Sequence, residues 1–317
     1  METAALTVQN PGLPYLEARQ SLIEKFINSL DVKPTSRSSY RRALKSYIDY
    51  LDTQNIELRY TDRETVLRYK QLLQERKLSD LTIGAYITTV RIFYEWAEAN
   101  KIYPNIAKGV KGASRSKGFK KNPITIEQIR ELLEQVDTSS LTGKRDYAIL
   151  NLLLRGGLRT IEIIRADIKD IGYKHGKLVI FVHGKGRDNK EDFVPLSDKK
   201  AYRPILDYLE ARGEKDPDAP LFVSHSNNSN GQRLTTRTIS KIVKEGLRSI
   251  GLDALNLTAH SLRHTAGVEY YRKTRDLYAT QLFMRHSDPA TTQIYLRTVE
   301  EEVRLNNYPG DILDEIF

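Results

Sequence analysis

The hydrophobic positions in the first third of the chain repeat with helical spacing. Apolar side chains recur three or four positions apart over residues 16–30, and again after the Pro-Thr-Ser sequence at residues 34–36. This spacing predicts two amphipathic helices. The same pattern predicts a third helix over residues 62–76 and a fourth over residues 81–100. Four helices with short links form a compact bundle of about one hundred residues, which is a normal domain size.

The second half of the chain combines helical patterns with two short β-rich runs. The helical patterns cover residues 125–135, residues 144–154, a short segment that ends at Ile164, and most of the chain from residue 202 onward apart from a polar loop at residues 224–231. The β-rich runs, residues 178–182 and 192–196, flank a segment rich in glycine and charge, which predicts a β-hairpin. We therefore expect a second domain that is mainly helical, with a small antiparallel sheet.

A change of composition separates the two halves. Residues 108–122 contain five lysines, one arginine and three glycines but no acidic residue, which predicts a flexible basic linker. Its positive charges are typical either of a solvated connection or of a contact with a polyanion. At the N-terminus, two prolines and little periodicity predict a mobile tail. The expected organisation is a tail over residues 1–14, a helical domain over 15–107, the linker over 108–122, a second domain over 123–299 and a tail over 300–317.

Composition narrows the class of protein. The chain is 39% hydrophobic and 29% charged, as a globular protein is, and 50 Lys and Arg against 41 Asp and Glu give a net charge of +9. This surplus favours a polyanionic partner, although ribosomal and membrane-surface proteins share it. The absence of cysteine excludes disulfides, thiolate zinc sites and a Cys nucleophile. Because no apolar run could span a membrane and no signal peptide is recognisable, we expect a cytoplasmic protein without a membrane partner.

The second domain carries four separated segments with candidate chemistry, of which the first surrounds Arg159. This residue follows a glycine pair at the start of a predicted helix, where free backbone N–H groups and a guanidinium suit an anion. Glu162, three residues later, can face Arg159 across one turn and fix its orientation. The alternative is an ordinary surface salt bridge.

The second segment is the predicted hairpin turn. Lys185 lies there between two glycines, and a hairpin tip can carry a long lysine into a groove of a partner. Arg187 and Lys190 compete for the same role. Lysines in turns also serve solubility alone.

The third segment holds a histidine and an arginine on one predicted helix. His260 and Arg263 are three residues apart, so they project from one face. A histidine and an arginine that converge in this way fit a phosphate. The alternative is a histidine satisfied in a helix contact and an arginine on the surface.

The fourth segment contains a helix break followed by a tyrosine. The sequence Ser-Asp-Pro at residues 287–289 is a helix cap with proline at the first helical position, so one helix ends near His286 and another begins. Tyr295 then lies about two turns into a short second helix. The break lets the Tyr295 hydroxyl turn back toward the other segments. In a chain with 18 tyrosines, a packing role is the alternative.

Taken together, the four segments resemble the tyrosine recombinase family, which includes phage integrases and Xer-like enzymes. GLRTIE, GKGRDNKEDFVPL, HSLRHT and RHSDPATTQIY resemble the family's first-arginine box, lysine hairpin, His-x-x-Arg box, and box for the second histidine and nucleophile. Their order and spacing agree over residues 122–299. The helical first domain resembles the core-binding domain of the family, most of all over residues 86–96.

The resemblance implies phosphoryl transfer on DNA. Tyr295 would attack the scissile phosphate and form a 3′-phosphotyrosine link, which leaves a free 5′-hydroxyl. Arg159 and Arg263 would hold the non-bridging oxygens of the phosphate. Lys185 would protonate the leaving 5′-oxygen.

The family pattern also assigns supporting roles. His260 and His286 would hydrogen-bond the phosphate or help to take the tyrosine proton. Glu162 would brace Arg159. Because the covalent link conserves the energy of the phosphodiester, the resemblance implies no cofactor, neither ATP nor a metal ion.

Two departures bear on the type of recombinase. Many Xer-type members have Leu-Gly-His where this chain has Met284-Arg285-His286, and Ala-Thr-Gly-Leu-Arg where it has Arg-Gly-Gly-Leu-Arg at residues 155–159. The Arg-His form resembles integrases of transposons and integrative conjugative elements. We therefore expect the integrase of a mobile element, which would act through a Holliday junction. The alternatives are a Xer-type dimer-resolution recombinase, a type IB topoisomerase, a DNA-binding regulator without catalysis and a metal-dependent nuclease.

Basic and polar side chains predict the contacts with double-stranded DNA. The second helix would present Arg37, Arg41, Arg42 and Lys45 on one face, the fourth helix Tyr86, Thr89 and Arg91, and the linker Lys108, Lys111, Arg115, Lys117, Lys120 and Lys121. Such a face could enter the major groove, and the linker could run along phosphates, or both could merely be solvated. The resemblance further implies specific recombination sites, a homotetramer on two sites and accessory DNA-bending or directionality proteins. The tail after residue 299 would pack on a neighbouring protomer or on its own domain.

Overall fold

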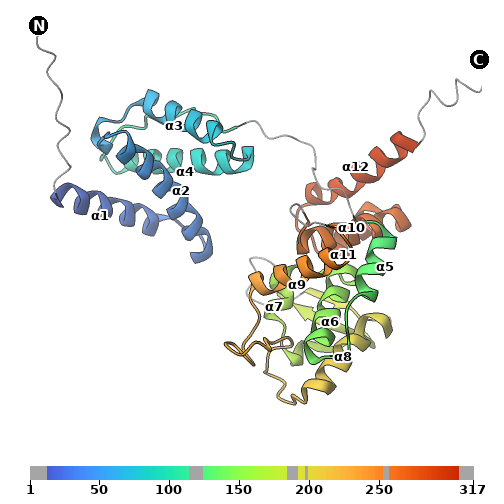
Figure 1. Ribbon diagram of the computed structural model, residues 1–317. Helices are drawn as coiled ribbons and strands as arrows, with labels where there is room; N and C mark the ends of the chain where they lie inside the picture. The colour runs from blue at the N-terminus through green and yellow to red at the C-terminus, as the bar shows by residue number, and fades with distance from the viewer. Residues whose placement is uncertain (1–12, 114–123, 184–191, 197–198, 253–256, 307–317) are drawn as a thin grey trace, which may run out of the picture. The chain divides into compact units, whose positions relative to one another are not determined.

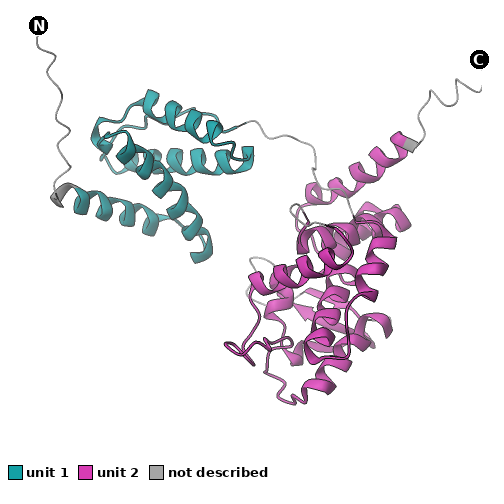
Figure 2. Ribbon diagram, in the orientation of Figure 1, with its two compact units in different colours: residues 1–118 teal, residues 119–317 magenta. Residues whose placement is uncertain are grey.

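The computed structural model describes residues 13–113, 124–183, 192–196, 199–252 and 257–306. They belong to two compact units, and the chain divides between these units after Gly118 (Figure 2). Each unit has a hydrophobic core of its own. Within this described part of the chain, none of the helices is long and apolar enough to cross a lipid bilayer.

The N-terminal unit is a helical bundle (Figure 1). Its elements are α1 (Leu13–Ser29), α2 (Pro34–Thr53), the 3-10 turn η1 (Leu58–Tyr60), α3 (Arg63–Glu75) and α4 (Asp80–Ala99). Local chemistry sets where the helices begin. Pro34 opens α2, and the side chains of Asp62 and Ser79 cap α3 and α4 by accepting bonds from backbone N–H groups. The four helices predicted from the hydrophobic pattern are all present.

Aromatic side chains fill the core of this unit, and buried hydroxyl groups among them are hydrogen-bonded to one another. Tyr47 and Tyr94 are completely buried, and their hydroxyl oxygens lie 3.0 Å apart. Thr61 Oγ1 lies 2.8 Å from the Tyr94 hydroxyl. A buried hydroxyl without a partner destabilises a fold, so this chain of hydrogen bonds allows tyrosine to serve as a core residue.

The first residues of the predicted linker belong to the folded N-terminal unit. Val110 is buried in its core, and Gly112 lies on α4, where an added Cβ would approach the Gly84 Cα to 3.1 Å. The prediction of a flexible segment from residue 108 is therefore wrong for residues 108–113. Composition misled here because lysines on the surface of a folded segment read the same as lysines of a linker. Residues 114–123 lie outside the described residues.

The C-terminal unit is mainly helical with one small sheet. Its helices are α5 (Ile126–Glu134), α6 (Leu141–Arg155), α7 (Thr160–Arg165), the 3-10 turn η2 (Ile168–Asp170), α8 (Lys199–Arg212), α9 (Thr236–Ser249), α10 (Ala259–Thr274), α11 (Leu277–Met284) and α12 (Pro289–Asn306). Its strands are β1 (Ile171–Lys174), β2 (Lys177–Val182) and β3 (Asp192–Pro195). The sheet is antiparallel with the order β1-β2-β3. The predicted fold class, mainly α with a small antiparallel sheet in the second domain, is confirmed.

The strand β1 has no counterpart among the predicted elements. It pairs with β2 in a register that sets Ile171 opposite Ile180, across a turn formed by His175 and Gly176. Both turn residues have positive φ, 48° and 73°. This geometry suits a tight hairpin whose twist matches that of its strands. The glycine at the second turn position was the signal available in the sequence.

The last helix is longer than predicted. α12 runs for 18 residues to Asn306, so the prediction of a short helix around Tyr295 is wrong. Two contacts explain the extension. Val299 is buried in a hydrophobic cluster with residues of α10 and α11. Glu302 accepts a hydrogen bond from Arg272 of α10 at 2.6 Å. Residues 307–317 of the predicted tail lie outside the described residues.

A small hydrophobic cluster packs α10, α11 and α12 together (Figure 1). Its buried members are Val268, Tyr271, Met284, Tyr295 and Val299. These residues come from all three helices. The cluster therefore fixes α12, and with it Tyr295, against α10 and α11.

Candidate active site

A glycine turn leads from α6 into α7 and sets the position of Arg159. Gly157 has a φ of +54°, a left-handed conformation that residues with a side chain rarely adopt. An added Cβ at Gly156 would lie 2.5 Å from Leu158 Cδ1, so a larger residue would require this buried side chain to move. The turn ends at Arg159, which is the N-cap residue of α7.

Glu162 lies behind Arg159 and binds it twice. Its Oε2 accepts a hydrogen bond from the Arg159 backbone N–H at 2.8 Å, and its Oε1 accepts one from Arg159 Nη1 at 2.7 Å. Glu162 is only 1% exposed, so the alternative of a surface salt bridge is wrong. Burial acts to raise the pKa of Glu162, but nearby guanidinium groups, led by Arg285, and the Arg159 N–H lower it below its usual value. The carboxylate is therefore ionised and orients Arg159.

Arg263 is buried at the centre of the site. It lies in the first half of α10 and is 2% exposed. Its Nη1 donates to the Gly157 carbonyl and its Nη2 to the Met284 carbonyl. Burial, followed by the charges of neighbouring arginines, lowers the pKa of Arg263 to about 9. Since this value is above neutrality, the guanidinium remains charged at pH 7.

His260 lies one turn before Arg263 on α10. Unlike Arg263, it is exposed. Its charge would still act on His286, since it contributes to the lowered pKa of that ring. His260 is therefore at the open edge of the site.

His286 lies in the break between α11 and α12 and is ordered by two contacts. Its Nδ1 lies 3.0 Å from Thr292 Oγ1. Its ring stacks on the Tyr295 ring with a centroid distance of 5.9 Å and an interplanar angle of 18°. Burial first, and then the nearby arginine charges, lower the pKa of His286 to about 4. The ring is therefore neutral at pH 7 and can accept a proton.

Tyr295 is buried between two histidines and a glycine. Its ring lies 5.2 Å from the His264 ring on one side and stacks on His286. An added Cβ at Gly267 would fall 2.6 Å from the Tyr295 Cζ. Burial raises the pKa of Tyr295 to about 12, while the charges of the site arginines act to lower it. At neutral pH the phenol is therefore protonated.

The structure brings most of the predicted catalytic groups into one place. Arg159, Arg263, His286 and Tyr295 come from three separated segments and influence one another electrostatically. Lys185, with its competitors Arg187 and Lys190, lies outside the described residues.

Sequence reasoning missed two residues that shape this site. Arg285, whose side chain is 5% exposed, donates to Glu162 Oε2 at 3.0 Å. Its place next to His286 was the available signal, but it was used only to compare types of recombinase. Gly267 gave no signal, since its need for a small side chain comes from Tyr295 in a distant helix.

Two protein-family models match the chain. The phage integrase SAM-like domain matches residues 18–108, and the phage integrase family matches residues 122–302, which is more than half of the chain. The chain belongs to the phage integrase family. It is thus a tyrosine recombinase, an enzyme that breaks and rejoins DNA strands.

The relatives of this tyrosine recombinase include several named recombinases. It is 29% identical over 300 residues to tyrosine recombinase XerD of Staphylococcus haemolyticus, covering 90% of this chain and 96% of that protein. Over 298 residues it is 26% identical to XerD of Staphylococcus aureus strain N315, with the same shares of each chain.

Two solved recombinase structures share the fold of this chain. The post-cleavage complex of the XerH recombinase with palindromic difH substrate has a TM-score of 0.71 at 21% identity, covering 86% of this chain and 79% of that chain. The Tn1549 transposon integrase in complex with transposon right end DNA has a TM-score of 0.66 at 17% identity, covering 90% and 98%.

In the N-terminal unit of this recombinase, several of the predicted DNA-binding cations have partners in the protein. Arg41 pairs with Glu24 at 2.5 Å, and Lys45 pairs with Asp49 at 2.7 Å. Arg37 donates to the Leu30 carbonyl at 3.1 Å. Exposed pairs of this kind are weak and exchange readily for a phosphate.

Other predicted DNA-binding residues differ in exposure. Arg42 and Tyr86 line a groove between α2 and α4, and Arg91 is exposed. Thr89 also borders this groove but is 3% exposed, and its Oγ1 donates to the Ala85 carbonyl at 3.0 Å. Its hydroxyl proton is therefore already used.

The predicted linker cations are divided between described and undescribed residues. Lys108 and Lys111 are exposed. Arg115, Lys117, Lys120 and Lys121 lie outside the described residues.

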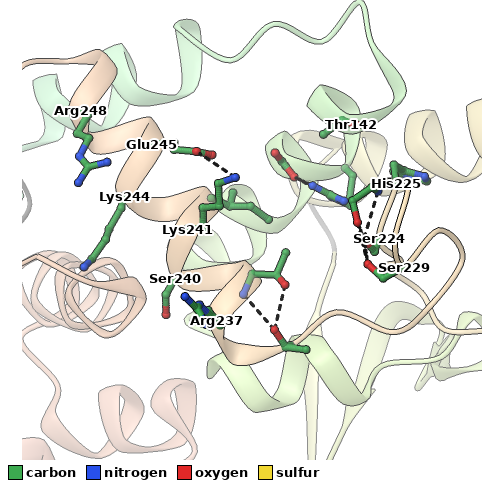
Figure 3. Close-up of a pocket in the computed structure, with 16 residues that line it drawn as sticks. Thr142, Ser224, His225, Ser229, Arg237, Ser240, Lys241, Lys244, Glu245 and Arg248 are labelled. Carbon is green, nitrogen blue, oxygen red and sulfur yellow. Dashed lines mark hydrogen bonds and ion pairs between the residues drawn. The ribbon is translucent and has the colours of Figure 1, made fainter.

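The C-terminal unit of this recombinase contains a basic pocket that sequence reasoning missed (Figure 3). Along α9, the exposed cations are Arg237, Lys241, Lys244 and Arg248. The opposite wall includes His225 and a cluster of serine hydroxyls, in which Ser224 and Ser229 lie 2.8 Å apart. The cations recur at helical spacing opposite the buried residues of α9, which is the same signal that pointed to α2.

Proposed function

We propose that Tyr295 is the nucleophile of this tyrosine recombinase and that Arg159 and Arg263 bind the scissile phosphate. The observation that carries the proposal is a convergence at the break before α12. The His286 ring stacks on Tyr295, and the two backbone carbonyls that precede His286 accept hydrogen bonds from Arg263 and Arg159. Arg159 keeps a quarter of its side chain exposed, so it can reach a phosphate while Glu162 holds it. Two guanidinium groups offer the fork geometry that suits phosphate oxygens.

The cleavage step transfers one phosphoryl bond. The Tyr295 oxygen forms a bond to phosphorus, the bond from phosphorus to the 5′-oxygen breaks, and a 3′-phosphotyrosine remains. The phenolic proton leaves to His286 or to another group at the site, and the 5′-oxygen receives a proton, which we assign to Lys185. Rejoining reverses these steps. Because the buried Tyr295 phenol, with a pKa raised to about 12, is a poor nucleophile at pH 7, it needs the charges of Arg263 and Arg159, which act to lower this pKa.

A covalent-capture assay tests the nucleophile. Wild-type protein and Tyr295→Phe are incubated with a nicked duplex substrate that carries the recognition site and traps the cleaved product. The wild type is expected to form a DNA adduct that survives denaturing gels, and Tyr295→Phe to bind DNA without forming one. Tyr278→Phe is the matched control, since Tyr278 is 68% exposed on α11. Undiminished cleavage by Tyr295→Phe would contradict the proposal.

The same assay separates the proposal from a metal-dependent nuclease. The proposed chemistry draws its positive charge from arginine side chains and keeps the phosphodiester energy in the phosphotyrosine. Adduct formation is therefore expected to persist in EDTA and without ATP. Loss of cleavage in EDTA, with recovery on added Mg²⁺, would favour the nuclease.

We propose three DNA-contact surfaces. One is the groove between α2 and α4 with Arg42 and Tyr86, another is the basic pocket of α9, and the third is the basic segment between the units. The solved XerH and Tn1549 integrase structures are complexes with DNA, which supports double-stranded DNA as the partner. Phosphate contacts of this kind give strongly salt-dependent binding. A DNA substrate also implies a cytoplasmic location.

For the biological reaction, we propose integration and excision of a mobile element by a tetramer on two recombination sites, through a Holliday junction. The Arg285-His286 sequence and the Tn1549 transposon integrase among the structural neighbours support it. Dimer resolution is the second candidate, since XerD proteins match 90% of this chain.

The DNA that flanks the coding region distinguishes these two candidates. Terminal repeats and mobilisation genes would identify a mobile element, and a substrate built from those repeats should then be excised by the purified protein. Excision that fails on the repeats but succeeds between two copies of a chromosomal site would favour dimer resolution. Relaxation of supercoiled plasmid that lacks either site would indicate a topoisomerase, and binding without cleavage a regulator.

A further inference from the structure

Arg285 occupies a backbone position that favours glycine. It ends α11 with φ 52° and ψ 49°, in the left-handed region. A side chain strains this conformation, whereas glycine adopts it freely. A strained residue next to a functional site persists only when surrounding contacts fix it.

The guanidinium of Arg285 makes the contacts that fix it. Its Nη1 donates to the Phe283 carbonyl at 2.8 Å and to the Gly156 carbonyl at 3.3 Å. Its Nη2 donates to the Gly157 carbonyl at 2.8 Å and to Glu162 Oε2 at 3.0 Å. One side chain thus ties the end of α11 to both glycines of the turn and to the carboxylate that orients Arg159.

Arg285 also holds Arg159 through its backbone. The Arg285 carbonyl accepts a hydrogen bond from Arg159 Nη2 at 2.9 Å. Arg159 is therefore held on two sides, by Glu162 and by the Arg285 carbonyl, and the Arg285 guanidinium joins these two supports. The four hydrogen bonds of the Arg285 guanidinium all go to protein groups, so we assign it an action through the residues that it holds.

Arg285 also contributes a positive charge to the balance of charges around Glu162. Three guanidinium groups, those of Arg159, Arg263 and Arg285, surround the single carboxylate of Glu162. Without Arg285, Glu162 would be free to pair more closely with Arg263, which lies 3.9 Å away, and would draw positive charge from the phosphate. With Arg285 in place, Glu162 Oε2 accepts a hydrogen bond from Arg285 and is not free to move toward Arg263.

We propose that Arg285 is a positioning residue for DNA cleavage, which keeps Glu162 occupied and Arg159 oriented so that both remaining guanidinium groups face the scissile phosphate. This inference rests on the proposed phosphate-binding role of Arg159 and Arg263. It concerns the rate of phosphoryl transfer and not the affinity for DNA, since the Arg285 guanidinium bonds to protein groups and acts through Glu162 and Arg159. Misplacement of a catalytic group by about 1 Å lowers rates by about 100-fold.

The test uses Arg285→Gly and Arg285→Lys in the full chain. Glycine removes the guanidinium and relieves the backbone, whereas lysine keeps one charge and loses the fork. The matched control is Arg275→Gly, because Arg275 ends α10 with φ 53° and is exposed. Three quantities are measured: the single-turnover rate of adduct formation at saturating protein, the Kd for the same duplex, and the thermal unfolding midpoint.

We expect Arg285→Gly to slow adduct formation by about 100-fold with a Kd within about twofold of wild type, and Arg285→Lys to recover part of the rate. Arg275→Gly should match the wild type. An unchanged rate for a folded Arg285→Gly overturns the proposal, as does a rate loss matched by an equal loss of affinity. If Arg285→Gly fails to fold, the lysine variant decides, and a wild-type rate there also overturns it.

The wild-type measurement distinguishes failure of the proposed function from failure of the proposed role of Arg285. A wild-type protein that forms no Tyr295-dependent adduct would indicate failure of the proposed function itself. A normal wild-type adduct with an unaffected Arg285→Gly variant would leave that function intact and remove only the role of Arg285.

Discussion

The ring of Tyr295 lies directly on the backbone of Gly267. A methyl group at Gly267 would fall 2.6 Å from Cζ and 2.8 Å from the neighbouring ring carbons, well inside van der Waals contact. Gly267 is in the interior of α10, where glycine lowers helix stability relative to alanine. Glycine at position 267 thus lowers the helix propensity of α10 but leaves the space that the Tyr295 ring occupies.

Gly267→Ala is therefore expected to displace Tyr295 and to abolish most adduct formation while DNA binding remains. The helix gains about 1 kcal/mol in propensity, but overpacking against the ring costs roughly 1–3 kcal/mol, so the unfolding midpoint should fall slightly. Covalent capture and thermal unfolding check the two effects. Gly84→Ala is the control for stability, because an added Cβ there meets no atom within 4 Å and should raise the midpoint.

Glu162→Gln is expected to destabilise the fold and slow cleavage together. The substitution removes the carboxylate that pairs with the guanidinium groups of Arg159, Arg263 and Arg285, and breaking a buried pair in this way costs about 3–5 kcal/mol. Chemical denaturation measures the loss. Glu245→Gln, which breaks an exposed pair with Lys241, should cost less than about 1 kcal/mol. Equal losses from the two substitutions would contradict the central role of Glu162.

Local patterns in the sequence were sufficient for the features that depend on neighbours in the chain. Hydrophobic spacing predicted the helices of the N-terminal unit, and Ser-Asp-Pro predicted the break before α12. The spacing of Arg159 and Glu162 predicted their contact across one turn. In each case the determining interaction joins residues three or four positions apart, which periodicity and capping rules describe.

Several features that depend on distant segments were not predicted, although the resemblance to tyrosine recombinases implied that the four catalytic segments meet. The inward direction of Arg285 follows from carbonyls of Gly156 and Gly157, more than a hundred positions away in the chain. The full length of α12 depends on Glu302 meeting Arg272 of α10. A single sequence carries no local trace of such contacts. The basic face of α9 is different, since the helical spacing of its cations is visible in the sequence itself.

The stability of the protein is expected to decrease as pH falls from about 6.5 to 4, in part through His286. Burial and the charges of Arg263, Arg159, Arg285 and His260 lower the pKa of this ring to about 4 in the folded state, against an ordinary 6.5. In that window the unfolded chain binds a proton that the folded state excludes, so acid favours unfolding. After allowance for solvent screening of this partly exposed ring, the loss is roughly 2 kcal/mol.

Denaturation curves at several pH values measure this effect as the difference in stability between the wild type and its histidine variants. His286→Gln should show a shallower decrease over the same window than the wild type. His175→Gln, at an exposed turn of the sheet, should follow the wild type. Parallel curves for the wild type and His286→Gln would mean that His286 titrates normally.

The basic pocket of α9 is expected to dominate the salt dependence of DNA binding by the C-terminal unit. Lys244 and Arg248 are exposed on the face of α9 that lines the pocket, so each can neutralise one phosphate and release its counterions (Figure 3). Replacing either by alanine should reduce the slope of log K against log salt by about 1, and weaken binding at low salt without regard to sequence. Fluorescence anisotropy over a salt series measures the slope. Arg203→Ala on α8 is the matched control, since this exposed arginine pairs with Asp207 at 2.7 Å, and it should leave the slope unchanged. An equal decrease for Arg203→Ala would show that the effect reflects net charge and not the pocket.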